Sequence, residues 1–348
     1  MKKICILVST LEIGGAEKQA IILSNILSKN FDVYLCVIFS EKINDQLSLK
    51  IGDKVKVLKL TEKGIIGKFF EFNRLIKGLK IDVIFSYLFA ANIFASLNGR
   101  MLNIKKVYTG VRNTNLPLHK HITEKFLNIF FATEIIFNSY KSRSQFYPKL
   151  DKGIVIGNCI ENINPPRNNF SSSKSLKILS ISRLTKQKDL KTALKSMKIL
   201  KEKKLNFHYT IIGYGEELSK IKKYAMKLGL LDHVTIESDN LKKLKALETS
   251  DLYLCTSIYE GMSNSIIEAM SYSLPIIATN VGDNNVLIEH GKNGYICGVK
   301  ESQSIANAIQ KLSINKSLRK KMAFESNKRV RQLCSMELFE ASYLELLK

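Results

Sequence analysis

Two glutamates, Glu260 and Glu268, have the residue type and spacing that most clearly suggest chemistry in this chain. They follow an apolar run at residues 251–255 that predicts a buried strand, and the second lies in a segment with helical apolar periodicity. One glutamate therefore belongs to a strand-to-helix loop and the other to the helix. Free N–H groups at a helix start favour an anion, and two carboxylates beside them suit sugar and ribose hydroxyls. The combination predicts a sugar-nucleotide site.

Two basic residues, Arg183 and Lys188, follow another predicted strand at residues 176–182. Arginine binds phosphate bidentately, whereas lysine acts as a point charge. Lys188 alone carries little weight in a lysine-rich chain. Arg183 at the end of a strand indicates a phosphate contact more strongly.

Glycine pairs mark two further junctions, at residues 14–15 after the first predicted strand and at residues 213–215 after the strand at 207–213. Such glycines let a backbone approach a phosphate or sugar, but they also occur in ordinary tight turns, and both interpretations stay open here. The first pair is not part of G-x-G-x-x-G, which disfavours a nicotinamide site.

Strand-like and helix-like segments alternate along the chain, which predicts parallel, doubly wound sheets. A segment rich in Asn, Pro and Ser separates two such halves, and the sequence after residue 317 is predicted to be helical throughout. We expect an N-terminal domain at 1–164, a linker at 165–175, a second domain at 176–325, and a C-terminal helix at 326–348 that packs back towards the first domain. The expected strands are 4–9, 33–39, 55–60, 83–87, 106–109, 134–137, 155–160, 176–182, 207–213, 234–236, 252–256 and 275–279.

The composition fits a two-domain protein with packed thiols. The chain has 348 residues, of which 45% are hydrophobic, and its six cysteines form no C-x-x-C pair, as is typical of a reduced cytosolic protein. The first apolar run is too short for a signal peptide, and the apolar stretch at 83–97 is shorter than the ~20 residues of a spanning helix.

The net charge of +23 predicts anionic partners, namely phosphates, nucleic acid or an acidic membrane surface. A lysine-rich coding bias that spreads charge over a solvated surface would explain the same number. The charge alone does not decide between these.

Arg183, Lys188, the Gly213 turn, Glu260 and Glu268 occur in this order, each at or beside a predicted β-to-α junction. In this joint pattern the chain resembles the GT-B retaining glycosyltransferases of family 4, with their E-x7-E signature. The resemblance extends over nearly the whole chain and includes the "GGxE" loop at residues 14–17 and the strand at 156–159. It implies the GT-B fold, with two Rossmann-like doubly wound parallel-sheet domains facing a central cleft.

The resemblance also implies a role for each matched residue. Arg183 and Lys188 would hold the donor diphosphate and stabilise the leaving group, and Glu260 would contact the donor sugar. Glu268 would bind the ribose hydroxyls. The other donor-binding candidates are glycines of the turns and small polar residues of the E-x7-E segment: Gly14, Gly15, Gly213, Gly261, Ser263, Asn264 and Ser265.

Three departures from the family pattern limit these assignments. Arg112 takes the place of a histidine near the reacting sugar, and it is a candidate for contact with acceptor or donor sugar. The segment at 237–239 lacks the usual glycine, so nucleobase contacts are not assigned. The late "GG…E" element reads VGDNNV at 281–286, without its glutamate.

The function implied is transfer of a hexose or N-acetylhexosamine from a nucleoside-diphosphate sugar, expected to be a UDP-sugar, to a lipid-linked glycan acceptor in bacterial surface polysaccharide synthesis (O-antigen, capsule or lipooligosaccharide). No cofactor is expected, and no metal site, because the chain has no Asp-x-Asp and its five histidines lack ligand spacing. Basic amphipathic segments at 63–80 and 116–131 suggest a cytoplasmic enzyme bound peripherally to an anionic inner-membrane surface. The oligomeric state is left open.

Three alternatives remain from the sequence. A GT-B-fold sugar-nucleotide epimerase would share the fold and nucleotide site, although the Arg…Lys and E-x7-E set favours transfer. A basic nucleic-acid-binding protein would explain the charge, but the chain has no RNP, KH, helix-turn-helix or zinc signature. A non-catalytic lectin-like module would bind the sugar nucleotide without turnover.

Overall fold

The computed structural model describes residues 1–12, 14–112, 117–147, 153–167, 175–239 and 242–348. These form two compact units, one comprising Met1–Asn158 with Glu337–Lys348 and the other Cys159–Met336. The chain therefore passes from the first unit to the second after residue 158, before the expected boundary at 164. Most of the expected linker at 165–175 lies outside the described residues.

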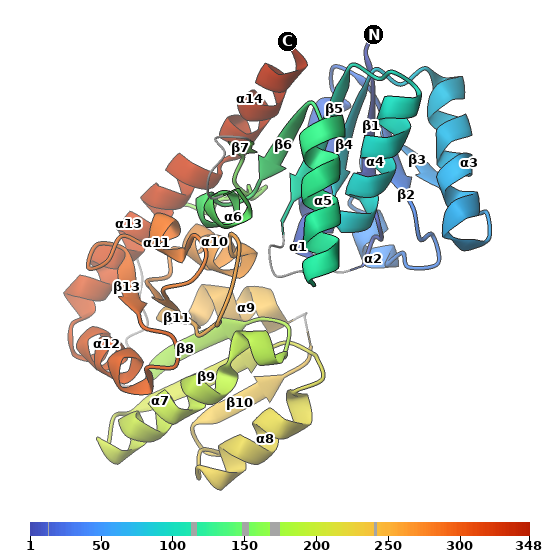
Figure 1. The fold of residues 1–348 in the computed structure, drawn as a ribbon. Coiled ribbons are helices and arrows are strands. Elements are labelled where there is room, and N and C mark those ends of the chain that lie inside the picture. Colours follow the sequence, from blue (N-terminus) through green and yellow to red (C-terminus); the bar gives the residue numbers. More distant parts are fainter. Residues whose placement is uncertain (13, 113–116, 148–152, 168–174, 240–241) are drawn as a thin grey trace. The chain divides into compact units, whose positions relative to one another are not determined.

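The first unit is built on a seven-stranded parallel sheet with the order β3-β2-β1-β4-β5-β6-β7 (Figure 1). Apolar runs such as residues 4–8 are buried on both faces, as expected for parallel strands covered by helices. The strands are β1 (Lys3–Val8), β2 (Asp32–Val37), β3 (Lys56–Lys59), β4 (Val83–Tyr87), β5 (Lys106–Val111), β6 (Glu134–Phe137) and β7 (Ile154–Val155).

Helices cover both faces of this sheet. The helices are α1 (Gly15–Leu27), α2 (Asp45–Ser48), α3 (Gly64–Leu79), α4 (Phe89–Met101), α5 (Leu118–Phe131), α6 (Tyr140–Phe146) and α14 (Met336–Leu347). Figure 1 shows α3, α4 and α5 side by side. Phe72 and Ile76 of α3 and Phe94 of α4 join one buried cluster with Cys5 and Ile84 of the sheet. The apolar stretch at 83–97 is thus a strand followed by a helix, as predicted.

The C-terminal segment returns to the first unit. Ser335 has an extended backbone (φ −71°, ψ 155°) and separates α13 from α14, so the predicted continuous helix is two helices. The carbonyl oxygen of Leu346 accepts hydrogen bonds from Tyr108 Oη (2.6 Å) and Lys106 Nζ (3.0 Å). The returning segment therefore begins at Glu337, later than the expected position 326.

The second unit has a six-stranded parallel sheet with the order β10-β9-β8-β11-β12-β13. Its strands are β8 (Leu176–Ile181), β9 (Phe207–Ile212), β10 (Val234–Glu237), β11 (Leu252–Cys255), β12 (Ile276–Thr279) and β13 (Gly294–Cys297). The last of these was not predicted. The two sheets bear out the expected pair of Rossmann-like, doubly wound domains.

Helices and one short turn connect the strands of the second sheet. They are η1 (Lys186–Lys188), α7 (Leu190–Glu202), α8 (Leu218–Lys227), α9 (Lys242–Thr249), α10 (Asn264–Ser271), α11 (Asn284–Leu287), α12 (Ser302–Ile314) and α13 (Lys316–Cys334). Buried side chains form one cluster that includes α7 and α12 and another that includes α10 and α13. Each face of the sheet therefore has its own apolar core.

Candidate active site

The strand order of the second unit creates a switch point between β8 and β11. The chain runs from β8 outwards to β9 and β10, then returns to β11 and continues outwards on the other side. In open parallel sheets, ligands bind in the crevice outside the carboxyl ends of strands at such a point. Arg183 and Lys188 follow β8, and Glu260 follows β11, so the predicted charged residues belong to adjacent strand ends.

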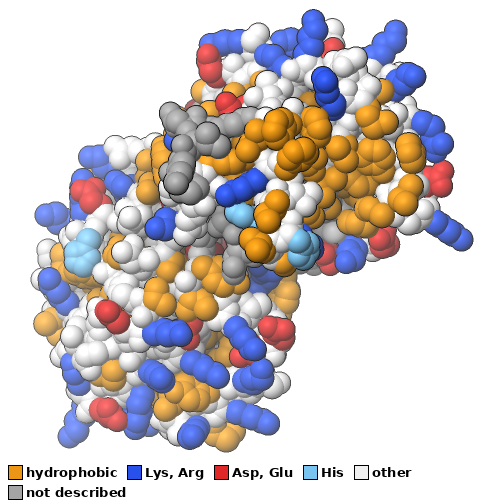
Figure 2. Space-filling view, viewed as in Figure 1, with side chains coloured by type: hydrophobic (Ala, Val, Ile, Leu, Met, Phe, Trp, Pro, Cys, Tyr) orange, Lys and Arg blue, Asp and Glu red, His pale blue; other side chains and the backbone are white. Residues whose placement is uncertain are grey.

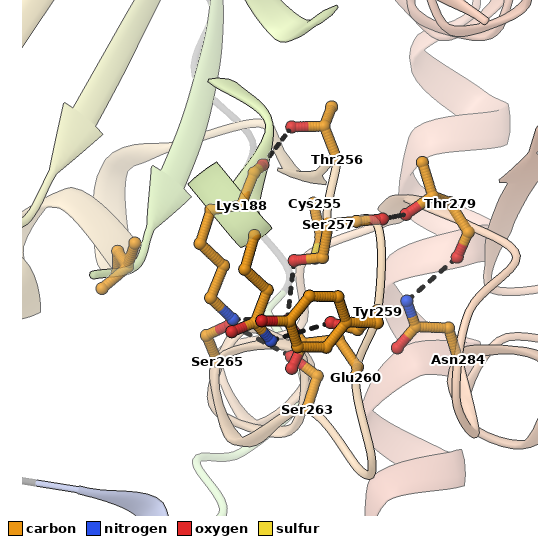
Figure 3. Close-up of polar contacts among 12 residues, drawn as sticks. Lys188, Cys255, Thr256, Ser257, Tyr259, Glu260, Ser263, Ser265, Thr279 and Asn284 are labelled. Atoms are coloured by element: carbon orange, nitrogen blue, oxygen red, sulfur yellow. Dashed lines mark hydrogen bonds and ion pairs between the residues drawn. The ribbon is translucent and has the colours of Figure 1, made fainter. Parts of the chain in front are cut away.

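Lys188 and Glu260 form an ion pair at these strand ends (Figure 3). The pair joins Lys188 Nζ to Glu260 Oε1, and the side chains are only 14% and 10% exposed. Ser257 Oγ donates a second hydrogen bond to Glu260 Oε1 at 2.7 Å. The carboxylate is therefore held in one orientation by two donors, and Ser257 is a site residue that sequence reasoning missed.

Backbone contacts tie the two loops together. Ile258 N donates to Gln187 O at 2.8 Å, and Gln187 Nε2 donates to Tyr259 O at 2.8 Å. Thr256 Oγ1 donates to the carbonyl oxygen of Lys188 at 2.9 Å. The loops after β8 and β11 thus form one hydrogen-bonded assembly that fixes Lys188 relative to Glu260.

The loop after β12 supports Glu260 from a third strand. Gly282 has a left-handed backbone (φ 53°), and a Cβ at this position would collide with the carbonyl oxygens of Glu260 and Gly261. Asp283 N donates to Gly261 O at 3.0 Å, and Thr279 Oγ1 donates to Ser257 O at 2.6 Å. Although the segment at 281–286 lacks the family glutamate, it braces the loop that carries Glu260.

The glycine turn after β9 packs against the loop of Arg183. A Cβ on Gly213 would collide with Ser182 O, and one on Gly215 would lie 2.5 Å from Leu184 O. Leu184 N donates to Tyr214 O at 2.7 Å. Close backbone packing alone therefore explains why both positions are glycine. Whether Gly213 also approaches a nucleotide stays a prediction.

Arg183 differs from Lys188 in having no internal partner. Its side chain is exposed, and within the described residues it forms neither an ion pair nor a hydrogen bond. A guanidinium fixed at its base by the packed 182–184 backbone and open at its tip is available to bind an anion bidentately.

Glu268, the second glutamate of the pair, lies in α10 and is bound by Lys243 of α9. Lys243 Nζ is 2.5 Å from Glu268 Oε1, and the side chains are 19% and 25% exposed. Each glutamate therefore has one lysine partner from a different element. Lys243 is a second neighbour that sequence reasoning missed.

The start of α10 carries the remaining predicted donor-binding residues. Ser263 is the N-cap, and its side chain does not cap the helix; its hydroxyl instead lies 3.2 Å from that of Ser265. The amides of the first turn, from Asn264 onwards, are not used within the helix. Only Met262 and the N-cap Ser263 separate Gly261 from this helix, so the amides and Glu260 belong to the same loop.

Cys255 ends β11 close to these charged groups. Burial raises the pKa of its thiol, and the negative charge of Glu260 raises it further. The thiol is thus kept protonated at neutral pH, which makes it a poor nucleophile. All six cysteines are buried and free, consistent with packed thiols.

The other predicted residues, Gly14, Gly15 and Arg112, belong to the first unit. Helix α1 begins at Gly15 with Gly14 as its N-cap, and a Cβ on Gly14 would collide with the carboxylate of Glu17. Arg112 Nη1 donates to Asn158 Oδ1 at 2.6 Å. The structure does not place these residues relative to the second unit, so their donor contacts stay predictions.

Comparison with known proteins shows which family and which relatives the chain is similar to. Residues 164–329 match the family of glycosyl transferases group 1. An uncharacterized glycosyltransferase of Haemophilus influenzae is 26% identical over 335 residues, covering 94% of each chain. The capsular polysaccharide biosynthesis glycosyltransferase CapH of Staphylococcus aureus is 24% identical and covers 90% of this chain and 91% of its own.

Solved structures share the fold of the whole chain. The crystal structure of HepE from Anabaena in complex with UDP and glucose has a TM-score of 0.84 at 19% identity, covering 100% of this chain and 99% of its own. The structure of TarM also has a TM-score of 0.84, at 15% identity, covering 100% and 99%.

These findings, with the two parallel-sheet units, define the GT-B fold. The chain is a glycosyltransferase: residues 164–329 match the group 1 glycosyl transferases, and the relatives that align with 90% or more of the chain are named glycosyltransferases. The predicted GT-B fold and the predicted glycosyltransferase class are confirmed, whereas family 4 membership and the retaining mechanism stay predictions.

Proposed function

We propose that the chain is a retaining glycosyltransferase that uses a nucleoside-diphosphate sugar as co-substrate and requires no other cofactor. The observation that carries this is the charged group at the ends of β8 and β11. There, Arg183 is open to an anion and Lys188 is fixed against Glu260. A diphosphate and a sugar hydroxyl are the ligands that suit such a combination.

The donor we propose is a UDP-sugar carrying a hexose or N-acetylhexosamine. Support comes from HepE of Anabaena, whose structures hold UDP and UDP-glucose on the same fold. The likeness is one of fold at 20% identity or less, so the base and the sugar are our proposal for this chain.

In the proposed reaction, the bond between the anomeric carbon and the diphosphate oxygen breaks while an acceptor oxygen bonds to the same face of that carbon. The proton of the acceptor hydroxyl passes to the departing diphosphate. Negative charge grows on this leaving group, and Arg183, Lys188 and the amides at the start of α10 are the groups positioned to stabilise it. Preorganised donors of this kind are usually the largest catalytic term.

A thermal-shift screen of nucleotides tests the donor proposal. UDP and UDP-sugars should raise the melting temperature of the full chain, because a ligand that binds only the folded state stabilises it by mass action. ADP, GDP and CDP at the same concentration serve as controls. Equal shifts for all four nucleoside diphosphates would contradict selection of uracil, and no shift for any would contradict the donor site itself.

Activity should be independent of divalent metal. Cationic side chains neutralise the diphosphate in our proposal, so turnover measured in excess EDTA should match turnover without it. Loss of activity in EDTA that Mg²⁺ or Mn²⁺ restores would contradict this prediction, and adding Zn²⁺-saturated EDTA controls for effects of the chelator itself.

We further propose that the acceptor is a lipid-linked glycan in bacterial surface polysaccharide synthesis. Relatives named for such pathways support this: CapH of Staphylococcus aureus and the amylovoran biosynthesis glycosyltransferase AmsD of Erwinia amylovora, which is 25% identical and covers 89% of each chain. The place of action that follows is the cytoplasmic face of the inner membrane, reached by peripheral binding. No helix in the described parts of the chain is long and apolar enough to cross a bilayer.

Both amphipathic helices expose apolar side chains, and the larger exposed set belongs to α5. In α3, Phe72 and Ile76 are buried in the core while Ile65, Ile66 and Phe70 are 50–70% exposed. In α5, five apolar side chains are 36–74% exposed. Figure 2 shows hydrophobic side chains gathered over this part of the first unit. The five residues are Leu118, Ile122, Phe126, Ile129 and Phe130.

The charges on α5 suit an anionic bilayer. Lys120 and Lys125 point over aromatic rings of Phe89 and Phe146, and the one acidic residue of the helix, Glu124, is 2% exposed. Burial raises the pKa of Glu124 to about 7. The exposed face of α5 is thus apolar with Lys120 as an exposed cation, and each cation near an anionic leaflet adds about 1 kcal/mol.

Liposome flotation tests this surface. Binding of the full chain should rise with the fraction of anionic lipid and fall with salt, and Ile122→Ser/Phe126→Ser should reduce it strongly. The matched control Leu231→Ser/Leu244→Ser changes exposed apolar residues of the second unit. Equal recovery with neutral and anionic vesicles, or no effect of the α5 changes, would contradict the proposal.

A further inference from the structure

Polar residues follow three adjacent strands of the first sheet where those strands end. Val111 and Phe137 are the last register pair of β5 and β6, so Arg112 and Asn138 are the next residues on neighbouring strands. Ile156 N donates to Phe137 O at 2.9 Å, which carries the chain towards Asn158 along the same edge. One cation and two amides therefore follow neighbouring strands at the carboxyl edge of this sheet.

The guanidinium of Arg112 is held in a fixed plane. Its Cζ lies 4.6 Å from the centre of the Tyr87 ring, and its Nη1 donates to Asn158 Oδ1 at 2.6 Å. The Tyr87 hydroxyl lies 3.2 Å from that of Tyr343, which fixes the ring in turn. Among the residues described, no carboxylate pairs with Arg112, and its buried Nε has no hydrogen-bond partner. This cation is preorganised but not neutralised.

Asn138 is a second, independent indication of a ligand-binding site. Its side chain is 6% exposed, and within the described residues its Oδ1 accepts no hydrogen bond. Buried polar atoms are nearly always satisfied, and an orphan acceptor costs free energy unless a ligand or water supplies a donor. A ligand that carries both an anionic group and a hydroxyl would satisfy the guanidinium and the amide together.

We propose that Arg112, Asn138 and Asn158 bind an anionic group, a phosphate or a carboxylate, of the acceptor substrate. This rests on the proposed function: the donor diphosphate is assigned to the strand ends of the second unit, which leaves the equivalent edge of the first unit for the other substrate. Arginine rather than lysine fits this assignment, because a planar guanidinium that already uses one nitrogen can still present two N–H groups to an oxyanion.

The test is a calorimetric titration of the full chain saturated with UDP, so that phosphate sites of the second unit are filled. The probes are inorganic phosphate, glucuronate and glucose. Phosphate or glucuronate should bind, glucose should not at the same concentration, and Arg112→Gln should weaken anion binding at least about tenfold while UDP affinity stays unchanged. Preference for phosphate indicates a lipid-linked phosphate, and preference for glucuronate an acidic sugar. Arg100→Gln, an exposed arginine of α4, is the matched control.

A second variant keeps the inference testable if Arg112→Gln does not fold. Asn138→Asp keeps the side-chain shape and adds a carboxylate at the end of the strand next to that of Arg112, so it should abolish anion binding without lowering the melting temperature. The inference is overturned if UDP-saturated protein binds neither anion, if Arg112→Gln binds them as tightly as the wild type, or if Arg112→Gln loses UDP and anion together. If the wild type does not bind UDP, the proposed function fails, and the same titration without UDP decides this inference alone.

Discussion

Replacing Lys188 with alanine should lower turnover by about 10²–10³-fold, the usual effect of removing one preorganised donor from a developing negative charge. Lys188 is fixed by Glu260 and by the backbone contacts of the loops after β8 and β11. Its ammonium therefore needs no reorganisation when the diphosphate leaves. Glu260→Ala should have a similar effect, because it removes both the partner of Lys188 and the proposed contact to the donor sugar.

Initial rates of donor consumption with an acceptor measure this effect. Lys186→Ala is the matched control, since Lys186 is an exposed lysine of the same short turn and should retain full activity. Removal of Lys188 leaves the carboxylate of Glu260 without its cationic partner and with little access to solvent, which can destabilise the fold. Melting temperatures must therefore show that each variant is folded. Lys188→Arg should recover part of the rate. A folded Lys188→Ala protein with near-normal turnover would show that its assigned role is wrong.

Replacing Glu268 with alanine should weaken UDP affinity by about 10–100-fold and affect turnover at saturating donor much less. Hydrogen bonds from hydroxyls to a carboxylate are charge-assisted, and each contributes about 1.5–3 kcal/mol. In the present structure Lys243 occupies one oxygen of Glu268. Lys243→Ala should therefore have a smaller effect than Glu268→Ala, since the carboxylate itself remains.

Calorimetric titration with UDP measures the affinities. Glu248→Ala, an exposed glutamate on the neighbouring helix α9, is the control and should bind UDP as the wild type does. Unchanged affinity of a folded Glu268→Ala protein would remove this residue from the nucleotide site. Such a result would also count against a lectin-like module that depends on the same glutamate.

The fold could be predicted from the sequence because long apolar runs bounded by turn residues have few alternative structures. Runs such as those of β1 and β4 were located to within a residue or two. Strand β13 was missed because it has only four residues, the first of them a glycine, and too little periodicity to recognise. The break at Ser335 was missed because nothing in its local sequence, which lacks Gly and Pro, marks a helix end.

The site could be predicted only as far as its residues lie at strand ends. Arg183, Lys188 and Glu260 were found because each follows a recognisable strand. Ser257 and Lys243 were not found, since their importance depends on contacts made through strand order and helix packing rather than on a local pattern. The helices α3 and α5 have similar patterns, and only packing shows which apolar side chains of each helix are buried in the core and which are exposed.

The most direct test of the central claim is to incubate the protein with a UDP-sugar labelled in the sugar, with and without a lipid-linked glycan acceptor. A transferase should release UDP and label the lipid only when acceptor is present, with slow background hydrolysis otherwise. The anomeric configuration of the product should match that of the donor. Conversion of the sugar nucleotide at the same rate without acceptor would indicate an epimerase and contradict the account.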